Sequence, residues 1–187
     1  MTSDECEEHL RTRQAYRMSG RYMVRAYPKG LLEAAMLRGL TLAEAREDVA
    51  LRLRCAPLRV ESHNMIVTLG LGLVADFLVD VVDAGVTYHA FGTGSVAPVM
   101  GNTALGTEAG RKLWTTRSRS GAVVSFSVFY AAASCTFYIR EVGAFGGAAA
   151  SATPGSGTLF NRALLDYDNS GGANDLTFDL TVTLANG

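Results

Sequence analysis

Hydrophobic and polar residues alternate strictly near the carboxyl end of the chain. From 176 to 184 every second residue is Leu, Phe or Val, and Thr or Asp stands between them. This two-residue period is typical of a β-strand with one buried face. The segment 124–130 alternates in a similar way, and we expect it to form a second strand.

Two further segments, 135–145 and 158–165, are rich in the aromatic and β-branched residues that strands favour. Gly-rich runs at 146–157 and 169–174 lie between the expected strands and supply turns. Short strands separated by such loops, with no long helices between them, are typical of an antiparallel sandwich. The pattern therefore predicts a mainly β protein in which residues 63–187 form a helix followed by an antiparallel β-sandwich domain.

The first part of the chain has a different pattern, which predicts helices. Arg recurs at every fourth position from 13 to 25, and in a helix these side chains would share one face. Residues 31–37 predict a short helix. Thr41 and Glu44 have the spacing of a capping box at the start of a further amphipathic helix. We therefore expect residues 1–62 to be a helical docking or attachment segment.

The most apolar stretch runs from Met65 to Val82 and predicts a helix near 63–82. A membrane-spanning helix needs roughly 20 apolar residues with few charges, and Asp76 and Asp80 interrupt this stretch. We therefore expect a buried or half-buried helix and no membrane partner. The acidic amino terminus also lacks the basic region and the apolar run of a secretory signal.

Charge narrows the classes of partner. The chain has 187 residues, with 17 Lys and Arg, 18 Asp and Glu, and a net charge of −1. Proteins that bind nucleic acid usually carry a basic excess, so this balance argues against a nucleic-acid partner. Residues 1–62 hold 20 of the charged side chains and the remaining 125 residues hold 15. This contrast supports a division of the chain near residue 62.

Residues that could bind a metal or act as nucleophiles are scattered along the chain. The three Cys residues match neither a disulfide framework nor a zinc site, and the three His residues have none of the spacings that hold a metal on one element. These residues are Cys6, Cys55, Cys135, His9, His63 and His89. The sequence therefore predicts no metal site, no cofactor site and no catalytic residue.

Two patterns have a chemical interpretation beside a structural one. The segment 91–95 (FGTGS) resembles a phosphate loop, but it lacks the Lys-Ser/Thr pair and the third Gly of such loops, which favours a turn after a strand. Glu141 with Asp166 or Asp168 could form the carboxylate pair of a glycosidase. A local ion pair between Glu141 and Arg140 is the structural interpretation.

Two clusters of basic and aromatic residues are candidate contact surfaces. The Arg residues of 13–25 alternate with Tyr residues, and both types are enriched at interfaces; a solvated face is the alternative. Trp114 has basic neighbours on both sides, and the alternative for it is a half-buried position at a strand edge.

Several motifs in a fixed order resemble a known group of proteins. They are Phe91-Gly-Thr-Gly-Ser-Val-Ala-Pro98, Asn102-Thr-Ala-Leu-Gly-Thr-Glu108, Ile139-Arg-Glu-Val-Gly-Ala-Phe145, Leu159-Phe-Asn-Arg-Ala-Leu-Leu165 and the alternating strand from Leu176. In combination they resemble bacteriophage virion proteins that are often labelled tail-fibre or tail structural proteins. The resemblance covers residues 63–187 and implies a virion protein that is made in the host cytoplasm.

We therefore expect a non-enzymatic virion structural protein of a tailed bacteriophage. Its sandwich would assemble with copies of itself, as a homotrimer, and its amino-terminal helices would dock to other virion proteins in the tail, baseplate or fibre attachment region. One alternative is a capsid decoration (cement) protein. Another is a carbohydrate-binding module for the host surface, although the loops 146–157 and 169–174 contain no aromatic residue for sugar binding.

Overall fold

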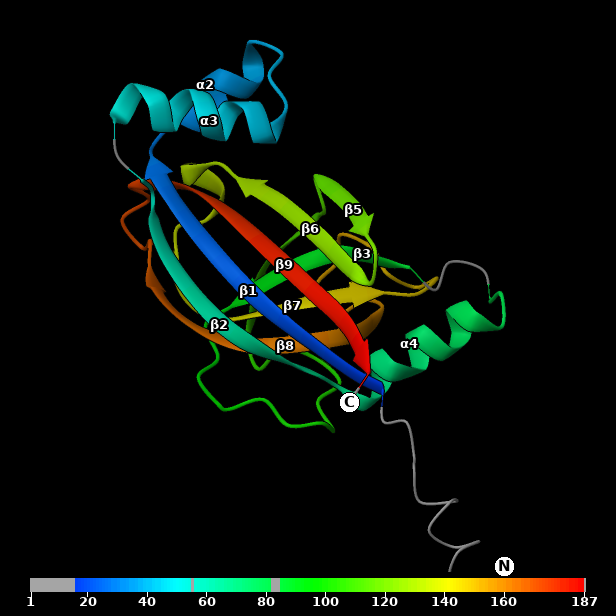
Figure 1. The fold of residues 1–187 in the computed structure, drawn as a ribbon. Coiled ribbons are helices and arrows are strands. Elements are labelled where there is room, and N and C mark those ends of the chain that lie inside the picture. Colours follow the sequence, from blue (N-terminus) through cyan, green and yellow to red (C-terminus); the bar gives the residue numbers. More distant parts are fainter. Residues whose placement is uncertain (1–15, 55, 82–84, 187) are drawn as a thin grey trace, which may run out of the picture.

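The fold is a single curled antiparallel sheet, shown in Figure 1, with helices at its two ends. The computed structural model describes residues 16–54, 56–81 and 85–186. Nine strands in the described residues follow the order β4-β3-β7-β8-β2-β1-β9-β6-β5 across the sheet. The strands are β1 (Tyr16–Pro28), β2 (Leu58–Ile66), β3 (Val86–Gly92), β4 (Glu108–Leu113), β5 (Thr116–Ser120), β6 (Val123–Tyr130), β7 (Tyr138–Gly146), β8 (Thr158–Asp168) and β9 (Asn174–Asn186). The expectation of a mainly β protein is confirmed.

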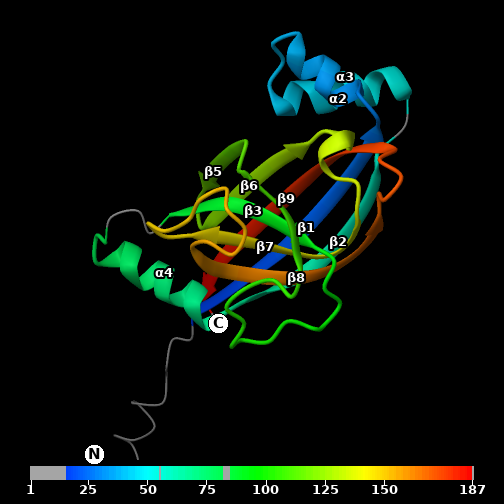
Figure 2. The ribbon, with the colours of Figure 1, turned by 180° about the vertical axis from the view of Figure 1, so that it is seen from behind.

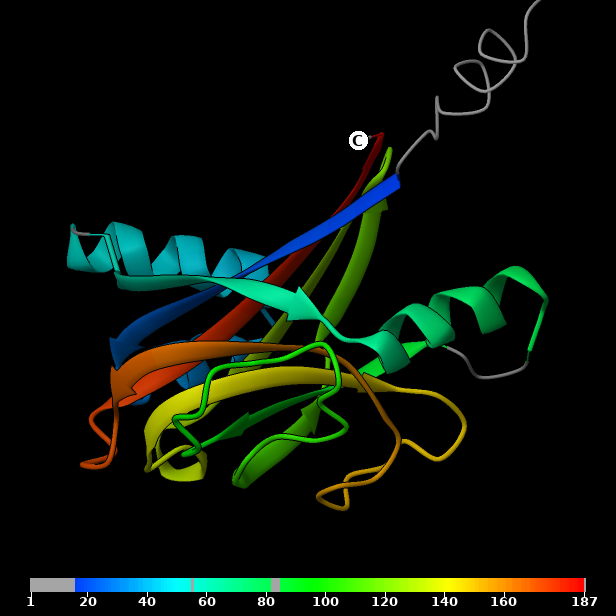
Figure 3. The same cartoon turned by 90° about the horizontal axis from the view of Figure 1, so that it is seen from below.

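The sheet is continuous because β2 is shared by its two halves. Residues 58–64 of β2 pair with β1, and residues 65 and 66 pair with β8. The sheet turns at this strand, so that β1, β9 and β6 face β3, β7 and β8 across the core (Figure 3). The two layers that a sandwich would have are therefore halves of one half-barrel sheet.

Strict alternation at the carboxyl end predicted β9 correctly. Leu176, Phe178, Leu180 and Val182 are all buried in the main core. β9 lies between β1 and β6, so both of its edges are hydrogen-bonded. Its regular period reflects a central strand whose apolar face meets the core from Leu176 to Val182.

The prediction that residues 1–62 are helical is wrong for two segments. Residues 16–28 form β1, which pairs with β2 and β9 in the middle of the sheet, and the expected division at 62/63 falls within β2. Arg17, Arg21 and Arg25 do share a face, but they share the outer face of a strand. A spacing of four residues fits a strand as well as a helix, and buried Tyr22, Val24 and Ala26 settle the period as two. Arg13 lies outside the described residues.

Two short helices between β1 and β2 confirm the middle of the amino-terminal prediction. These are α2 (Leu31–Leu37) and α3 (Leu42–Leu53), and the capping box of Thr41 and Glu44 is formed. Leu32, Ala35, Leu42, Ala45 and Val49 bury a small core against Phe129 of β6. Arg46 on α3 also donates a hydrogen bond to Asp179 of β9 (2.7 Å). The helical pair is therefore packed against one end of the sheet.

A third helix, α4 (Thr68–Leu78), lies at the opposite end of the sheet (Figures 1 and 2). The sequence predicted it near 63–82, but β2 continues to Ile66. Gly70 allows α4 to approach β8 closely, since a Cβ at this position would lie 2.0 Å from the carbonyl oxygen of Phe160. No helix in the described part of the chain combines the length and the apolar character needed to cross a membrane.

Candidate functional site

Four of the five motifs of the sequence converge on the buried carboxylate of Glu141 in β7. Its Oε1 accepts hydrogen bonds from the backbone N–H groups of Gly94 (3.0 Å) and Thr107 (2.7 Å). Its Oε2 accepts from the backbone N–H of Gly106 (2.9 Å) and from Nε of Arg162 in β8 (2.8 Å). The side chains of Glu141 and Arg162 are both buried. The carboxylate of Glu141 therefore has four hydrogen-bond donors from the protein and no contact with solvent.

Arg162 extends this network to the rest of the loop between β3 and β4. Its Nη1 donates to Oδ1 of Asn102 (3.1 Å), and its Nη2 donates to the carbonyl oxygen of Val96 (2.9 Å). The loop 93–107, seen in green in Figure 2, is therefore attached to the sheet at both of its ends and at its middle. We call Glu141, Arg162 and the backbone groups they bind the loop brace.

Glycines are required where the loop meets the carboxylate. A Cβ at Gly94 would lie 2.3 Å from Oε1 of Glu141, and a Cβ at Gly92 would lie 2.7 Å from the same atom. Only a residue without a side chain lets the backbone N–H approach this closely. The segment 91–95 is thus the end of a strand and the start of a loop, as the structural interpretation predicted.

The expected carboxylate pair is not assembled. Asp166 and Asp168 are exposed on β8, whereas Glu141 is buried inside the sheet. Asp166 accepts a hydrogen bond from the hydroxyl of Tyr138, and Asp168 accepts one from the backbone N–H of Ser170 (2.9 Å), which lowers the pKa of Asp168. Arg140 is not the ionic partner of Glu141, because Arg162 occupies that place. The geometry makes Glu141 a structural carboxylate.

His89 is enclosed by aromatic rings. It stacks at an angle on Phe178, with ring centroids 4.4 Å apart, and its Nδ1 is 3.1 Å from the hydroxyl of Tyr130. Burial lowers the pKa of His89 to about 3, because the charged imidazolium is poorly solvated there. His89 is therefore a neutral core residue at ordinary pH.

The other candidate ligands and nucleophiles remain apart. His63 is exposed on β2, while His9, Cys6 and Cys55 lie outside the described residues. Cys135 follows a short 3-10 turn and precedes β7, and burial raises the pKa of its thiol to about 12. Among the described residues there is no group of three His, Cys, Asp or Glu that could hold a metal ion.

Trp114 is a core residue at the corner between β4 and β5. It is 7% exposed and packs against Phe126, with ring centroids 5.2 Å apart. Its neighbour Arg111 is also turned inward: the guanidinium lies 4.0 Å from the ring centroid of Phe145 and pairs with Glu108 (2.6 Å). Of the basic residues around Trp114, Arg111 is thus turned into the protein, whereas Lys112 and Arg117 are exposed.

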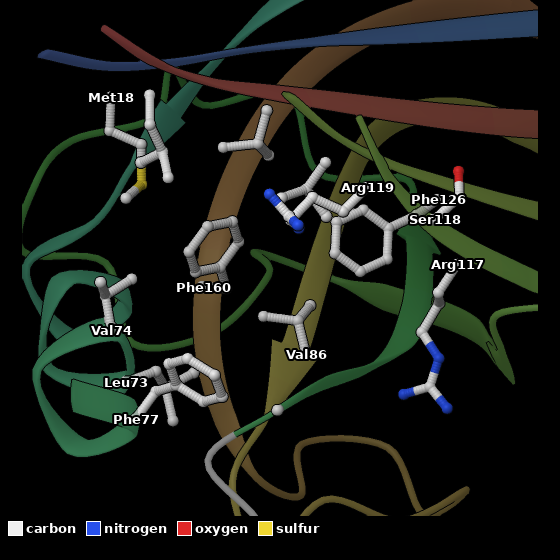
Figure 4. A pocket seen from close by; sticks show the side chains of 14 residues that line it. Met18, Leu73, Val74, Phe77, Val86, Arg117, Ser118, Arg119, Phe126 and Phe160 are labelled. Carbon is white, nitrogen blue, oxygen red and sulfur yellow. The ribbon is translucent and has the colours of Figure 1, made fainter. Parts of the chain in front are cut away.

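An apolar groove of about 550 Å³ opens between α4 and the adjacent end of the sheet (Figure 4). We call it the α4 groove. One wall is formed by α4, the base by Phe160 of β8, and the opposite wall by β5, β6 and β9. The side chains lining it are Met18, Leu73, Val74, Phe77, Val86, Arg117, Ser118, Arg119, Val124, Phe126, Phe160, Val182 and Leu184.

Sequence reasoning did not find this groove, because its residues come from seven separate elements. The one local signal was the apolar stretch near 65–82, which has more hydrophobic residues than a helix with one buried face requires. In the structure only Gly70 and Leu73 of α4 are fully buried. Most of the other apolar side chains of α4 therefore lie on the protein surface and do not extend the core.

Comparisons with known proteins give no relative for this chain: no family model matches it, no curated protein is similar to it, and no solved structure resembles it.

Proposed function

We propose that this protein is a non-enzymatic structural component of a bacteriophage virion and that it assembles with copies of itself. The residues that could have supported chemistry have structural partners instead. Glu141 is saturated by four donors, and burial keeps His89 neutral and the thiol of Cys135 protonated. These features favour a protein that acts through its surfaces.

The observation that carries the proposal is the exposed apolar surface of α4 and the residues after it. Phe77, Leu78 and Val79 are 71%, 78% and 74% exposed, and Leu69, Leu71 and Val81 are also exposed. Monomeric proteins rarely expose contiguous apolar patches above a few hundred Å², and larger patches mark interaction sites. An interface between copies would remove these side chains from water.

Other parts of the fold fit an assembly role. The two halves of the half-barrel sheet would act as the layers of a sandwich and give the subunit a rigid body. The helices α2 and α3 lie at the end of the sheet opposite α4, so they would be free to dock to other virion proteins while α4 contacts a second copy (Figure 1). We place the subunit in the tail, baseplate or fibre attachment region, as a homotrimer.

The test is the mass of the purified protein in solution. Light scattering coupled to gel filtration at micromolar concentration should give a multiple of 19.9 kDa. Leu71→Gln with Leu78→Gln should shift the protein to the monomer, because both side chains lie on the outer side of α4. The matched control is Leu37→Gln with Leu51→Gln, which changes leucines on α2 and α3 that are at least as exposed and should leave the mass unchanged. A wild-type monomer would refute self-assembly.

The place on the particle needs a separate experiment. A gold-labelled antibody against this protein, viewed on whole phage particles by electron microscopy, should label the tail end. Label spread over the capsid would assign it to capsid decoration instead. Intact particles that contain no copy of the chain by mass spectrometry would refute a virion role.

A further inference from the structure

The α4 groove combines an apolar interior with two basic side chains at its edge. Arg117 and Arg119 alternate along β5 and both lie on the side of the strand that faces the groove. Figure 4 shows the guanidinium of Arg119 turned toward Phe160, and that of Arg117 at the rim. Within the described residues neither guanidinium has a carboxylate partner, and Arg119 donates only to the carbonyl oxygen of Gly121 (2.8 Å).

The far end of α4 has the complementary character. Asp76 and Asp80 are exposed, one helical turn apart in sequence, and apolar Phe77, Leu78 and Val79 lie between them. In the described part of the chain neither carboxylate forms an ion pair. Among the described residues, the groove thus has two cations without a carboxylate partner, and the apolar helix end beside it has two anions without a cationic partner.

We propose that the distal end of α4 from one copy occupies the α4 groove of the next copy. Leu78 and Val79 of the inserted end would cover Phe77, Phe126 and Phe160 of the neighbour, while Asp76 and Asp80 would pair with Arg117 and Arg119 of the neighbour. This inference rests on the proposed self-assembly and names the two surfaces that meet.

The geometry of such a contact determines the kind of assembly. In the proposed trimer, the copy that receives a helix end is not the copy that fills the donor's own groove, so the interface is heterologous. Each copy donates one helix end and accepts another. Heterologous interfaces close into rings when the rotation between copies permits it, and a ring of three copies agrees with the expected homotrimer.

Charge reversal tests the pairing directly. Arg117→Asp with Arg119→Asp reverses the groove, and Asp76→Arg with Asp80→Arg reverses the helix end. Each pair of substitutions should weaken assembly by at least about tenfold in dissociation constant, because like charges then meet across the interface. All four substitutions in one chain should restore assembly, since opposite charges again face one another. Arg17→Asp, on the outer face of β1, is the matched control and should have no effect.

The outcomes separate this inference from the proposal on which it rests. Sedimentation velocity of the full chain gives the copy number, and far-UV circular dichroism shows that each variant remains folded. If the wild type is an oligomer and neither reversal weakens it, self-assembly stands but the α4 groove is not the contact. If both reversals weaken assembly and the fourfold variant does not restore it, the pairing is wrong.

A small amphipathic ligand is the competing occupant of the groove. Isothermal titration of the wild type with dodecanoate tests it, since this probe has an apolar chain and one carboxylate. Under our inference the assembled protein should not bind dodecanoate at the groove, because the neighbouring helix already fills it. Binding of one dodecanoate per chain with no change in copy number would overturn the inference.

Discussion

Replacing Glu141 with Gln tests whether the loop brace holds the loop 93–107 on the sheet. The substitution keeps the shape of the side chain but removes its charge and puts an amide N–H₂ in place of one oxygen. Whichever oxygen is replaced, the new donor faces two donors: either Gly94 and Thr107, or Gly106 and Arg162. Arg162 then remains buried, at 2% exposure, without an opposite charge.

The expected cost follows from these contacts. Breaking a buried ion pair by removing one partner typically destabilises a protein by about 3–5 kcal/mol. Native domains have a total stability of only about 5–15 kcal/mol, so the loss should be large. The comparable change at the surface is Glu61→Gln, which removes an exposed pair with Arg21 (3.2 Å). Exposed pairs contribute about 0–1 kcal/mol, so this control should remain close to the wild type.

Two measurements check the prediction. Urea unfolding, followed by the fluorescence of the single tryptophan, gives the free energy of unfolding for each variant at one fixed chain concentration. Hydrogen exchange reports the loop itself: the amides of Gly94, Gly106 and Thr107 should exchange faster in Glu141→Gln. A variant within 1 kcal/mol of the wild type, with unchanged exchange at these amides, would refute the role assigned to the brace.

Two further predictions concern the interior. Gly94→Ala would place a Cβ 2.3 Å from Oε1 of Glu141 and should cost about 1–3 kcal/mol in urea unfolding, whereas Gly101→Ala, with no atom within 4 Å of its Cβ, should be neutral. The pKa of His89 is about 3 in the folded state against an ordinary 6.5, so only the unfolded chain binds a proton as the pH falls below about 6.5. The contribution of His89 to the free energy of unfolding is thus lost on acidification. Between pH 7 and 5 the free energy of unfolding should fall by about 2 kcal/mol more in the wild type than in His89→Phe. Parallel profiles of unfolding free energy against pH for the two proteins would contradict this.

Local patterns in the sequence predicted those elements whose signals lie within a few residues. β9 alternates over nine positions, and its apolar face meets the core from Leu176 to Val182. Thr41 and Glu44 form a capping box that depends on no other part of the chain. β1 shows the limit of this reasoning, since Arg at every fourth position fits two periods. Its pairing with β2 and β9, which are distant in sequence, decided in favour of a strand.

The candidate site was predictable only in part, for the same reason. The motifs containing Gly94, Gly106, Glu141 and Arg162 were visible, but their roles were not. The residues next to Glu141 in the sequence do not show whether its carboxylate is open to a substrate or enclosed by hydrogen-bond donors. Folding brings the four donors together from three separate segments. The α4 groove had even less signal, because its lining residues come from seven elements.

What the sequence by itself determined about this protein is its class and its local elements: a mainly β chain, two short helices in the amino-terminal part of which the second has a capping box, and an apolar helix before the central strands. These follow from hydrophobic period and capping, which act between neighbours along the chain. Only the tertiary structure decided which strands pair, which charges are buried, and that α4 keeps apolar side chains in contact with water. Those properties depend on contacts between residues that are distant in sequence. Such contacts decide whether a side chain is removed from water, and therefore whether its burial is favourable.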